Sequence, residues 1–151
     1  MNHLKANQQI VYKVARQAGL SRQSSLVIAA NFTGESLANP YLKKWDIRHF
    51  SQGIAQWDDV RSARIARKFG KEPHLLSVAE QVSAFLWEIG NYYPQTFRAL
   101  HNDGLTPNEK MFTVVHDFER PHNPYVAVKQ RMKFYNGLEG WLKDADTTGA
   151  K

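Results

Sequence analysis

Most hydrophobic residues of the chain recur every three to four positions, which is the period of an α-helix. The first such segment runs from about His3 to Ala18, and Gly19 provides a C-terminal stop. Ser21 is a candidate N-cap for a second helix from about Arg22 to Gly34. The centre of this second helix, residues 26–32 (LVIAANF), is apolar on nearly every side. The pattern therefore predicts a helix buried in the middle of the fold.

Capping signals and the positions of proline and glycine predict five more helices. Ser77 with Glu80, and Thr106 with Glu109, form two capping boxes. Proline suits the first turn of a helix because it has no N–H to leave unpaired. The five helices are expected from about Asp58 to Phe69, Ser77 to Ile89, Pro94 to His101, Thr106 to Phe118 and Tyr125 to Leu142.

The stretch from Glu35 to Asp58 breaks this periodicity. It contains Asn39 followed by Pro40, scattered polar residues and the segment 50–57 (FSQGIAQW). Such a stretch is typical of a loop that leads into a short β-hairpin. The whole pattern predicts a mainly α fold of the α+β kind, with about seven helices and one small β-hairpin.

The composition indicates one folded unit. The chain has 151 residues, of which 42% are apolar and 23% charged, which is a globular composition at the length of one domain. We predict a single domain over residues 1–143 and a flexible tail over 144–151 (DADTTGAK). Because the sequence has no cysteine, disulfides, cysteine zinc sites, iron–sulfur clusters and thiol nucleophiles are excluded.

The charge balance indicates an anionic partner. Lys and Arg number 20 and Asp and Glu number 14, a net charge of +6 that DNA, lipid headgroups or the bacterial wall would attract. Arg61, Arg64 and Lys68 share one face of a predicted helix, which fits a solvated surface or contact with an anionic wall or outer-membrane surface. We expect no nucleic-acid partner, because no helix-turn-helix pairing or aromatic RNA-binding motif is present. No apolar run suits a secretory signal or a membrane span.

Glu35 is the first candidate for chemistry. It ends the buried second helix, where burial and the negative end of the helix dipole both raise the pKa of a carboxyl towards that of a general acid. Asp46 lies 11 residues further on and Ser51 lies 16 residues further on, and a hairpin could fold both back over the helix end. Glycoside hydrolysis needs this division between an acid and an opposing carboxylate. The alternative is that Glu35 and Asp46 are solvated surface residues.

Other residues have a structural interpretation beside the functional one. Trp57 and Tyr92, and less so Tyr93, could line a sugar cleft or simply pack in the core. The segment 116–122 (HDFERPH) holds several potential metal ligands, but its spacing fits no standard zinc motif. We therefore expect no metal there, and a polar turn in which Glu119 and Arg120 pair with neighbouring groups.

Two segments together resemble a known family. Residues 31–36 (NFTGES) followed by residues 51–57 (SQGIAQW) are similar to the signature of the phage tail lysozyme family, within the lysozyme-like superfamily. The Glu-Ser pair and the Gly-Ile-Ala-Gln turn also resemble motifs of soluble lytic transglycosylases. Residues 117–121 (DFERP) are similar to a later segment of the phage family, and the resemblance extends over about residues 11–138.

The resemblance implies a lysozyme-like fold with its hairpin beside an active-site cleft. It also implies cleavage of the β-1,4 bond between N-acetylmuramic acid and N-acetylglucosamine in peptidoglycan, by a monomer that needs no cofactor. Glu35 corresponds to the catalytic acid, and Asp46 and Ser51 resemble the Asp and Thr of phage-type lysozymes, with Ser in place of Thr. Gln56 corresponds to a cleft residue that holds a sugar or orients the hairpin, and Gln52 is a further candidate for binding the substrate.

Several alternatives stay open at this point. If Asp46 faces the cleft, hydrolysis is favoured; if it points away, Glu35 could act as both acid and base, as in lytic transglycosylases. A third alternative is a basic virion or nucleic-acid-binding protein without activity. A phage-encoded enzyme could act as an endolysin on the host wall in the periplasm after release, or be carried in the virion.

Overall fold

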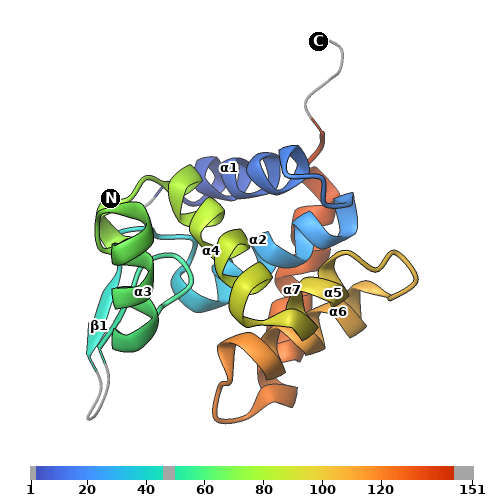
Figure 1. Cartoon of the computed structure of the whole chain (residues 1–151). Helices are drawn as coiled ribbons and strands as arrows, with labels where there is room; N and C mark the ends of the chain where they lie inside the picture. The colour runs from blue at the N-terminus through green and yellow to red at the C-terminus, as the bar shows by residue number, and fades with distance from the viewer. Residues whose placement is uncertain (1–2, 46–49, 145–151) are drawn as a thin grey trace.

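The computed structural model describes residues 3–45 and 50–144 and shows a mainly helical fold, as predicted (Figure 1). The described residues form seven α-helices, a single 3-10 turn, a π-helical turn and two short antiparallel strands. None of these helices is both long and apolar enough to cross a membrane. The helices are α1 (Leu4–Gln17), α2 (Arg22–Ser36), α3 (Asp59–Phe69), α4 (Val78–Tyr92), α5 (Pro94–Leu100), α6 (Pro107–Thr113) and α7 (Pro124–Trp141).

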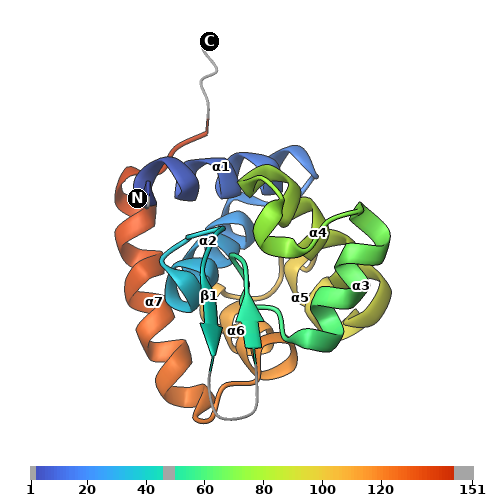
Figure 2. The same cartoon turned by 90° about the vertical axis from the view of Figure 1, so that its left-hand side faces the viewer.

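The core is built around α2, which lies between α1 and α7 and also contacts α6 (Figure 2). The apolar residues 26–30 and Phe32 are fully buried, which confirms the burial predicted from the all-round apolar pattern. Phe32 packs edge-on against Phe85 of α4 at 5.1 Å, and Phe85 in turn contacts Phe118 at 4.9 Å between ring centroids. The second helix therefore forms the central support of the fold.

Local signals set most helix starts. The Ser21 hydroxyl accepts a hydrogen bond from the backbone N–H of Ser24, and both predicted capping boxes are present. The end of α2 differs from the prediction, because the helix continues two residues beyond Gly34 to Ser36. It stops at Leu37, whose φ of 56° is left-handed. Glu35 therefore lies inside the last turn of α2.

The predicted helix from Thr106 to Phe118 is divided in two. After α6, residues Val114–Glu119 (η2) form a π-helical turn, which ends at Arg120 with a left-handed φ of 52°. The apolar spacing of Val114, Val115 and Phe118 suits an α-helical or a π-helical turn, so it did not reveal the change. A π-helical turn is uncommon and frequently occurs at functional sites.

The hairpin consists of β1 (Lys43–Trp45) and β2 (Phe50–Gln52). Lys44 pairs with Ser51, whereas Trp45 pairs with Phe50. Since side chains alternate along a strand, the first pair and the second pair lie on opposite faces of the hairpin. The rings of Trp45 and Phe50 lie 4.6 Å apart, on the face away from Lys44 and Ser51.

A tight turn connects the hairpin to α3. The backbones of Gln52 and Trp57 exchange two hydrogen bonds of 3.0 and 2.9 Å, which close the turn over residues 53–56. Gly53 has a φ of 81°, and a Cβ atom there would lie 3.0 Å from both Gln81 and the Trp57 ring. This turn therefore requires glycine at its first position.

The segment that follows α7 is bound to α1. Asp144 accepts hydrogen bonds from the Tyr12 hydroxyl at 2.5 Å and from Arg16 Nε at 2.8 Å. Asp144 is the first residue of the segment that we predicted to be a flexible tail, and the rest of that segment lies outside the described residues.

Candidate active site

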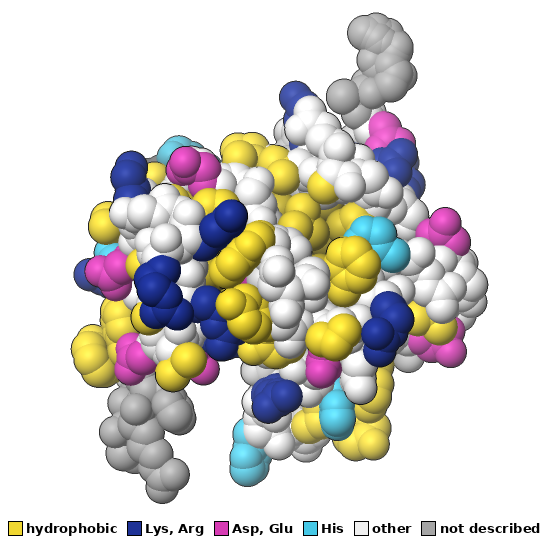
Figure 3. Space-filling model, viewed as in Figure 1, with side chains coloured by type: hydrophobic (Ala, Val, Ile, Leu, Met, Phe, Trp, Pro, Cys, Tyr) yellow, Lys and Arg dark blue, Asp and Glu magenta, His cyan; other side chains and the backbone are white. Residues whose placement is uncertain are grey.

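Two adjoining cavities lie between the hairpin and the π-helical turn, and we call them together the cleft. The larger, of about 470 Å³, is lined by Glu35 and Lys44 among others, and the smaller, of about 300 Å³, by Arg61 and Tyr93 among others. Both cavities are lined by Ser51, Gln56 and Glu119. In the space-filling view the surface is notched at the bottom, between the hairpin side and the segment before α7 (Figure 3). The predicted residues Glu35, Ser51 and Gln56 therefore lie in one cleft.

Glu35 enters the cleft from the last turn of α2, and its side chain is 17% exposed. Burial raises the pKa of Glu35 above its ordinary value, although the positive charges of Arg131, Arg61 and Lys44 act in the opposite direction. The sequence-based expectation of a raised pKa is confirmed, and burial is its main cause. A raised pKa favours the protonated form of this carboxyl, which is the form that a general acid needs.

Arg131 of α7 is the closest charged neighbour of Glu35. Its Nη2 atom forms an ion pair with Glu35 Oε2, and its Nε atom donates a 3.0 Å hydrogen bond to Asn31 Oδ1. A Cβ atom at Gly34 would lie 2.8 Å from Arg131 Cγ, so glycine leaves the room that this side chain needs to lie across α2. Arg131 was not predicted from the sequence, because nothing in the local pattern links α7 to the end of α2.

Replacing Arg131 by methionine is expected to raise the pKa of Glu35 further. The guanidinium group favours the ionised carboxylate, so its loss leaves burial less opposed. In a pH–rate profile, the alkaline limb at which Glu35 loses its proton should move to higher pH. The measurement is a carboxyl titration of Arg131→Met by NMR beside the wild type, and an unchanged or lowered pKa would contradict the assignment.

Glu119 is a second carboxyl of the cleft that sequence reasoning missed. Asn31 Nδ2 donates a 2.6 Å hydrogen bond to Glu119 Oε2, so Asn31 joins Glu119 to the Arg131–Glu35 pair. Burial raises the pKa of Glu119 well above its ordinary value, and the nearby carboxylate of Glu35 raises it further. The expected polar turn is present, but its glutamate faces the cleft. The only sequence signal was the family-like segment 117–121.

Gln56 is fixed at the end of the turn that follows β2. Its backbone has a left-handed φ of 54°, and its Nε2 donates to the carbonyls of Gly53 at 2.8 Å and Leu42 at 3.3 Å. Its Oε1 atom is buried and has no hydrogen-bond partner among the residues that the structure describes. A buried acceptor without a donor is costly, so the hydrogen bonds of Nε2 and the packing of the turn must hold Gln56 in this position.

Two of the predicted sugar-binding residues face away from the cleft. Trp57 is fully buried, and its Nε1 donates a 2.8 Å hydrogen bond to Glu88. Gln52 is 2% exposed and binds Glu72 and His74 on the α3 side of the hairpin. For Gln52 the reason is the strand alternation, which puts Ser51 in the cleft and its neighbour Gln52 on the other face.

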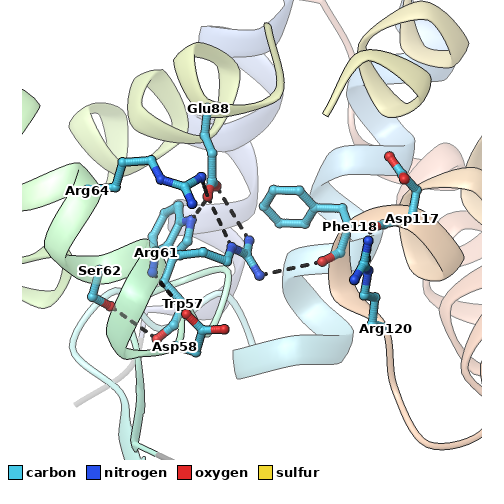
Figure 4. A network of polar contacts seen from close by, with 9 residues as sticks. All are labelled: Trp57, Asp58, Arg61, Ser62, Arg64, Glu88, Asp117, Phe118 and Arg120. Carbon is cyan, nitrogen blue, oxygen red and sulfur yellow. Dashed lines mark hydrogen bonds and ion pairs between the residues drawn. The ribbon is translucent and has the colours of Figure 1, made fainter. Parts of the chain in front are cut away.

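Arg61 is not part of an exposed cationic face, contrary to the prediction. It is only 9% exposed, and its Nε lies 3.0 Å from Glu88 Oε2, while its guanidinium lies 4.0 Å from the Phe118 ring centroid (Figure 4). Arg64 lies 3.9 Å from the same Glu88 carboxylate. Only Lys68 of the three predicted residues is exposed. The spacing of positions 61, 64 and 68 correctly indicates one face of a helix, but this face packs on α4.

Tyr92 also differs from the expectation. Its ring is 48% exposed and lies 3.9 Å below the Arg64 guanidinium, whereas the neighbouring Tyr93 lines the smaller cavity.

Asp46, the remaining predicted catalytic residue, lies outside the described residues. Within residues 3–45 and 50–144, no group of three His, Asp or Glu side chains lies close enough to hold a metal ion.

A mainly helical fold with a small antiparallel hairpin beside a cleft that holds Glu35 is that of a lysozyme-like protein. The family model for phage tail lysozyme matches residues 6–136, and the chain belongs to this family. A comparison with curated protein sequences found no match. Membership of the family implies a peptidoglycan-degrading, lysozyme-like activity and a phage-encoded protein.

Proposed function

We propose that the protein is a muramidase, which hydrolyses the β-1,4 bond between N-acetylmuramic acid and N-acetylglucosamine. The observation that carries this proposal is Glu35, a partly buried carboxyl with a raised pKa that lines a cleft also lined by Ser51 and Gln56. Glycoside hydrolysis requires a carboxylic acid that still holds its proton when the substrate arrives. Family membership supports the same substrate class.

In the proposed reaction, Glu35 gives its proton to the glycosidic oxygen as the bond to the anomeric carbon breaks. The sugar then carries positive charge, and water adds to the anomeric carbon. Ser51 and Gln56, which line both cavities, would hydrogen-bond the sugar and fix its position. Asp46 is our sequence-based candidate for stabilising this positive charge or placing the water.

A lytic transglycosylase is the second candidate. The feature that favours it is the hydrogen bond from the Ser36 hydroxyl to the Ile54 carbonyl, which joins the Glu35-Ser36 pair to the turn over residues 53–56. Both segments resemble transglycosylase motifs. In that reaction Glu35 would act first as acid and then as base, and the C6 hydroxyl of the muramic acid would close an anhydro ring.

Mass analysis of the products decides between the two reactions. Purified peptidoglycan digested by the wild-type protein should give muramic acid ends that have gained one water molecule. Anhydromuramic ends, which lack that water, would overturn the hydrolase proposal in favour of the transglycosylase. If no glycan bond is cleaved, both proposals fail, and salt-sensitive retention on DNA would then support a non-catalytic basic protein.

For the biological setting, we propose an endolysin or a virion-associated lysozyme. The net charge of +6 would attract the protein to anionic wall polymers in either setting. Detection of the protein in purified phage particles would support the virion role, and its absence from particles with accumulation late in infection would support the endolysin role.

A further inference from the structure

We propose that Glu119 is the second catalytic carboxyl of the cleft, and that it takes the proton from the hydrolytic water while Glu35 protonates the leaving oxygen. This inference rests on the proposed muramidase function. It assigns a chemical role to the π-helical turn Val114–Glu119, which neither the fold nor the family-like motifs explain.

The position of Glu119 is the first argument. Three carboxyl side chains line the cleft among the described residues, namely Glu35, Asp58 and Glu119. Asp58 is already used as the N-cap of α3, where it accepts a 2.9 Å hydrogen bond from the backbone of Arg61. Glu35 and Glu119 line the same cavity, from α2 and from the π-helical turn. A water molecule and a sugar could therefore meet both groups.

The hydrogen bonding of Glu119 is the second argument. Its Oε2 atom accepts the 2.6 Å hydrogen bond from Asn31, and Asn31 is fully buried and held by Arg131. The hydrogen bonds within the described part of the chain leave the other oxygen, Oε1, without a donor. One oxygen is thus fixed by the protein, and the other is available to a water molecule.

The charges around the pair support a shared proton. Arg131 forms its ion pair with Glu35, whereas Glu119 receives only a neutral amide donor, so the negative charge is better compensated on Glu35. Burial raises the pKa of both carboxyls, and that of Glu119 more strongly. Arg61 of α3 lowers the pKa of both groups, and Lys44 of β1 lowers that of Glu35. Three further titratable groups line the cleft, namely Tyr93, Arg120 and His122.

The contacts of the free protein favour the single proton on Glu119 and the negative charge on Glu35, which is paired with Arg131. The reaction starts from the other arrangement of the same proton, on Glu35, with the negative charge on Glu119. Glu35 gives its proton to the glycosidic oxygen, which leaves as a hydroxyl with both electrons of the broken bond. Water forms the new bond to the anomeric carbon and loses its proton to Glu119. The pair ends with the same single proton, now on Glu119, so no other reactant is needed. Attack by water from the face opposite the leaving group inverts the anomeric configuration.

The test compares Glu119→Gln with two other variants. Glu119→Gln should lower the rate of peptidoglycan cleavage by about 10²- to 10⁴-fold, as expected for loss of a general base. Glu139→Gln is the matched control. Glu139 is exposed on α7, so this substitution makes the same chemical change at a position outside the cleft. Asp46→Asn tests the rival candidate. If the wild type cleaves peptidoglycan and Glu119→Gln is as active as Glu139→Gln, this inference is overturned. The proposed function is then unaffected.

Two readouts separate a catalytic role from a structural one. Azide should restore activity to Glu119→Ala and give a glycosyl azide, because a small anion needs no base to remove its proton. The wild type should lose activity at low pH, when both carboxyls are protonated, and this acidic limb should be absent from the residual activity of Glu119→Gln. Retention of configuration in the first product, or loss of the acidic limb in Asp46→Asn alone, would contradict the assignment. Failure of the wild type itself to cleave peptidoglycan would count against the proposed function instead.

Discussion

Glu35→Gln is expected to lower peptidoglycan cleavage by about 10²- to 10⁴-fold while the fold is retained. Glutamine has nearly the same shape as glutamate, and its carbonyl oxygen can still accept a hydrogen bond from Arg131. It cannot give a proton to the glycosidic oxygen. The loss should therefore appear in the rate of bond cleavage and much less in binding of the wall.

The measurement is the release of soluble fragments from purified peptidoglycan, with a thermal unfolding curve for each variant. Glu139→Gln, whose side chain is exposed on α7, controls for the change of charge. Equal cleavage by the wild type and Glu35→Gln would remove Glu35 from the mechanism and, with it, both the hydrolase and the transglycosylase interpretations.

Glu88→Gln is expected to lower the free energy of unfolding by about 3–5 kcal/mol, the cost of breaking a buried ion pair. The Glu88 carboxylate is fully buried and accepts hydrogen bonds from Trp57 Nε1 at 2.8 Å and Arg61 Nε at 3.0 Å (Figure 4). Glutamine has one acceptor oxygen in place of two, and its NH₂ group would face a donor. Arg61 would remain buried without its counter-charge.

Urea unfolding of Glu88→Gln beside the wild type measures this effect, and activity at a temperature where both are folded separates it from catalysis. Glu139→Gln should change stability by no more than about 0.5 kcal/mol, as is usual for an exposed position. A loss below 1 kcal/mol in Glu88→Gln would mean that the Arg61–Glu88 pair contributes little, since burial of both charges would then offset their attraction.

The helices were predictable because their signals are local. The capping boxes at Ser77 and Thr106 involve residues three positions apart, and the apolar run 26–32 identifies the central helix without knowledge of its neighbours. Glu35 was found for the same reason, since it lies three residues after the end of that run. Its raised pKa depends mainly on burial, which the run itself predicts.

The residues that the sequence analysis misplaced depend on contacts between distant segments. Arg61 looks like a surface arginine until α4 brings Glu88 beside it, 27 positions later in the chain. Trp57 is buried by the same contact, which no periodicity reveals. Arg131 forms its ion pair with Glu35 across 96 positions of the chain. Glu119 is held by Asn31, which lies 88 positions before it. The π-helical turn was hidden because its apolar spacing also fits an α-helix.

The alternation of the hairpin restricts how this protein can vary in length. Lys44 and Ser51 line the cleft, whereas Trp45 and Phe50 stack on the opposite face. One residue inserted into or deleted from either strand would exchange these faces, withdrawing Ser51 and turning an aromatic ring towards Glu35. An insertion between the strands leaves this register unchanged. Related proteins that keep the same cleft should therefore tolerate length changes between the two strands while retaining the lengths of the strands themselves.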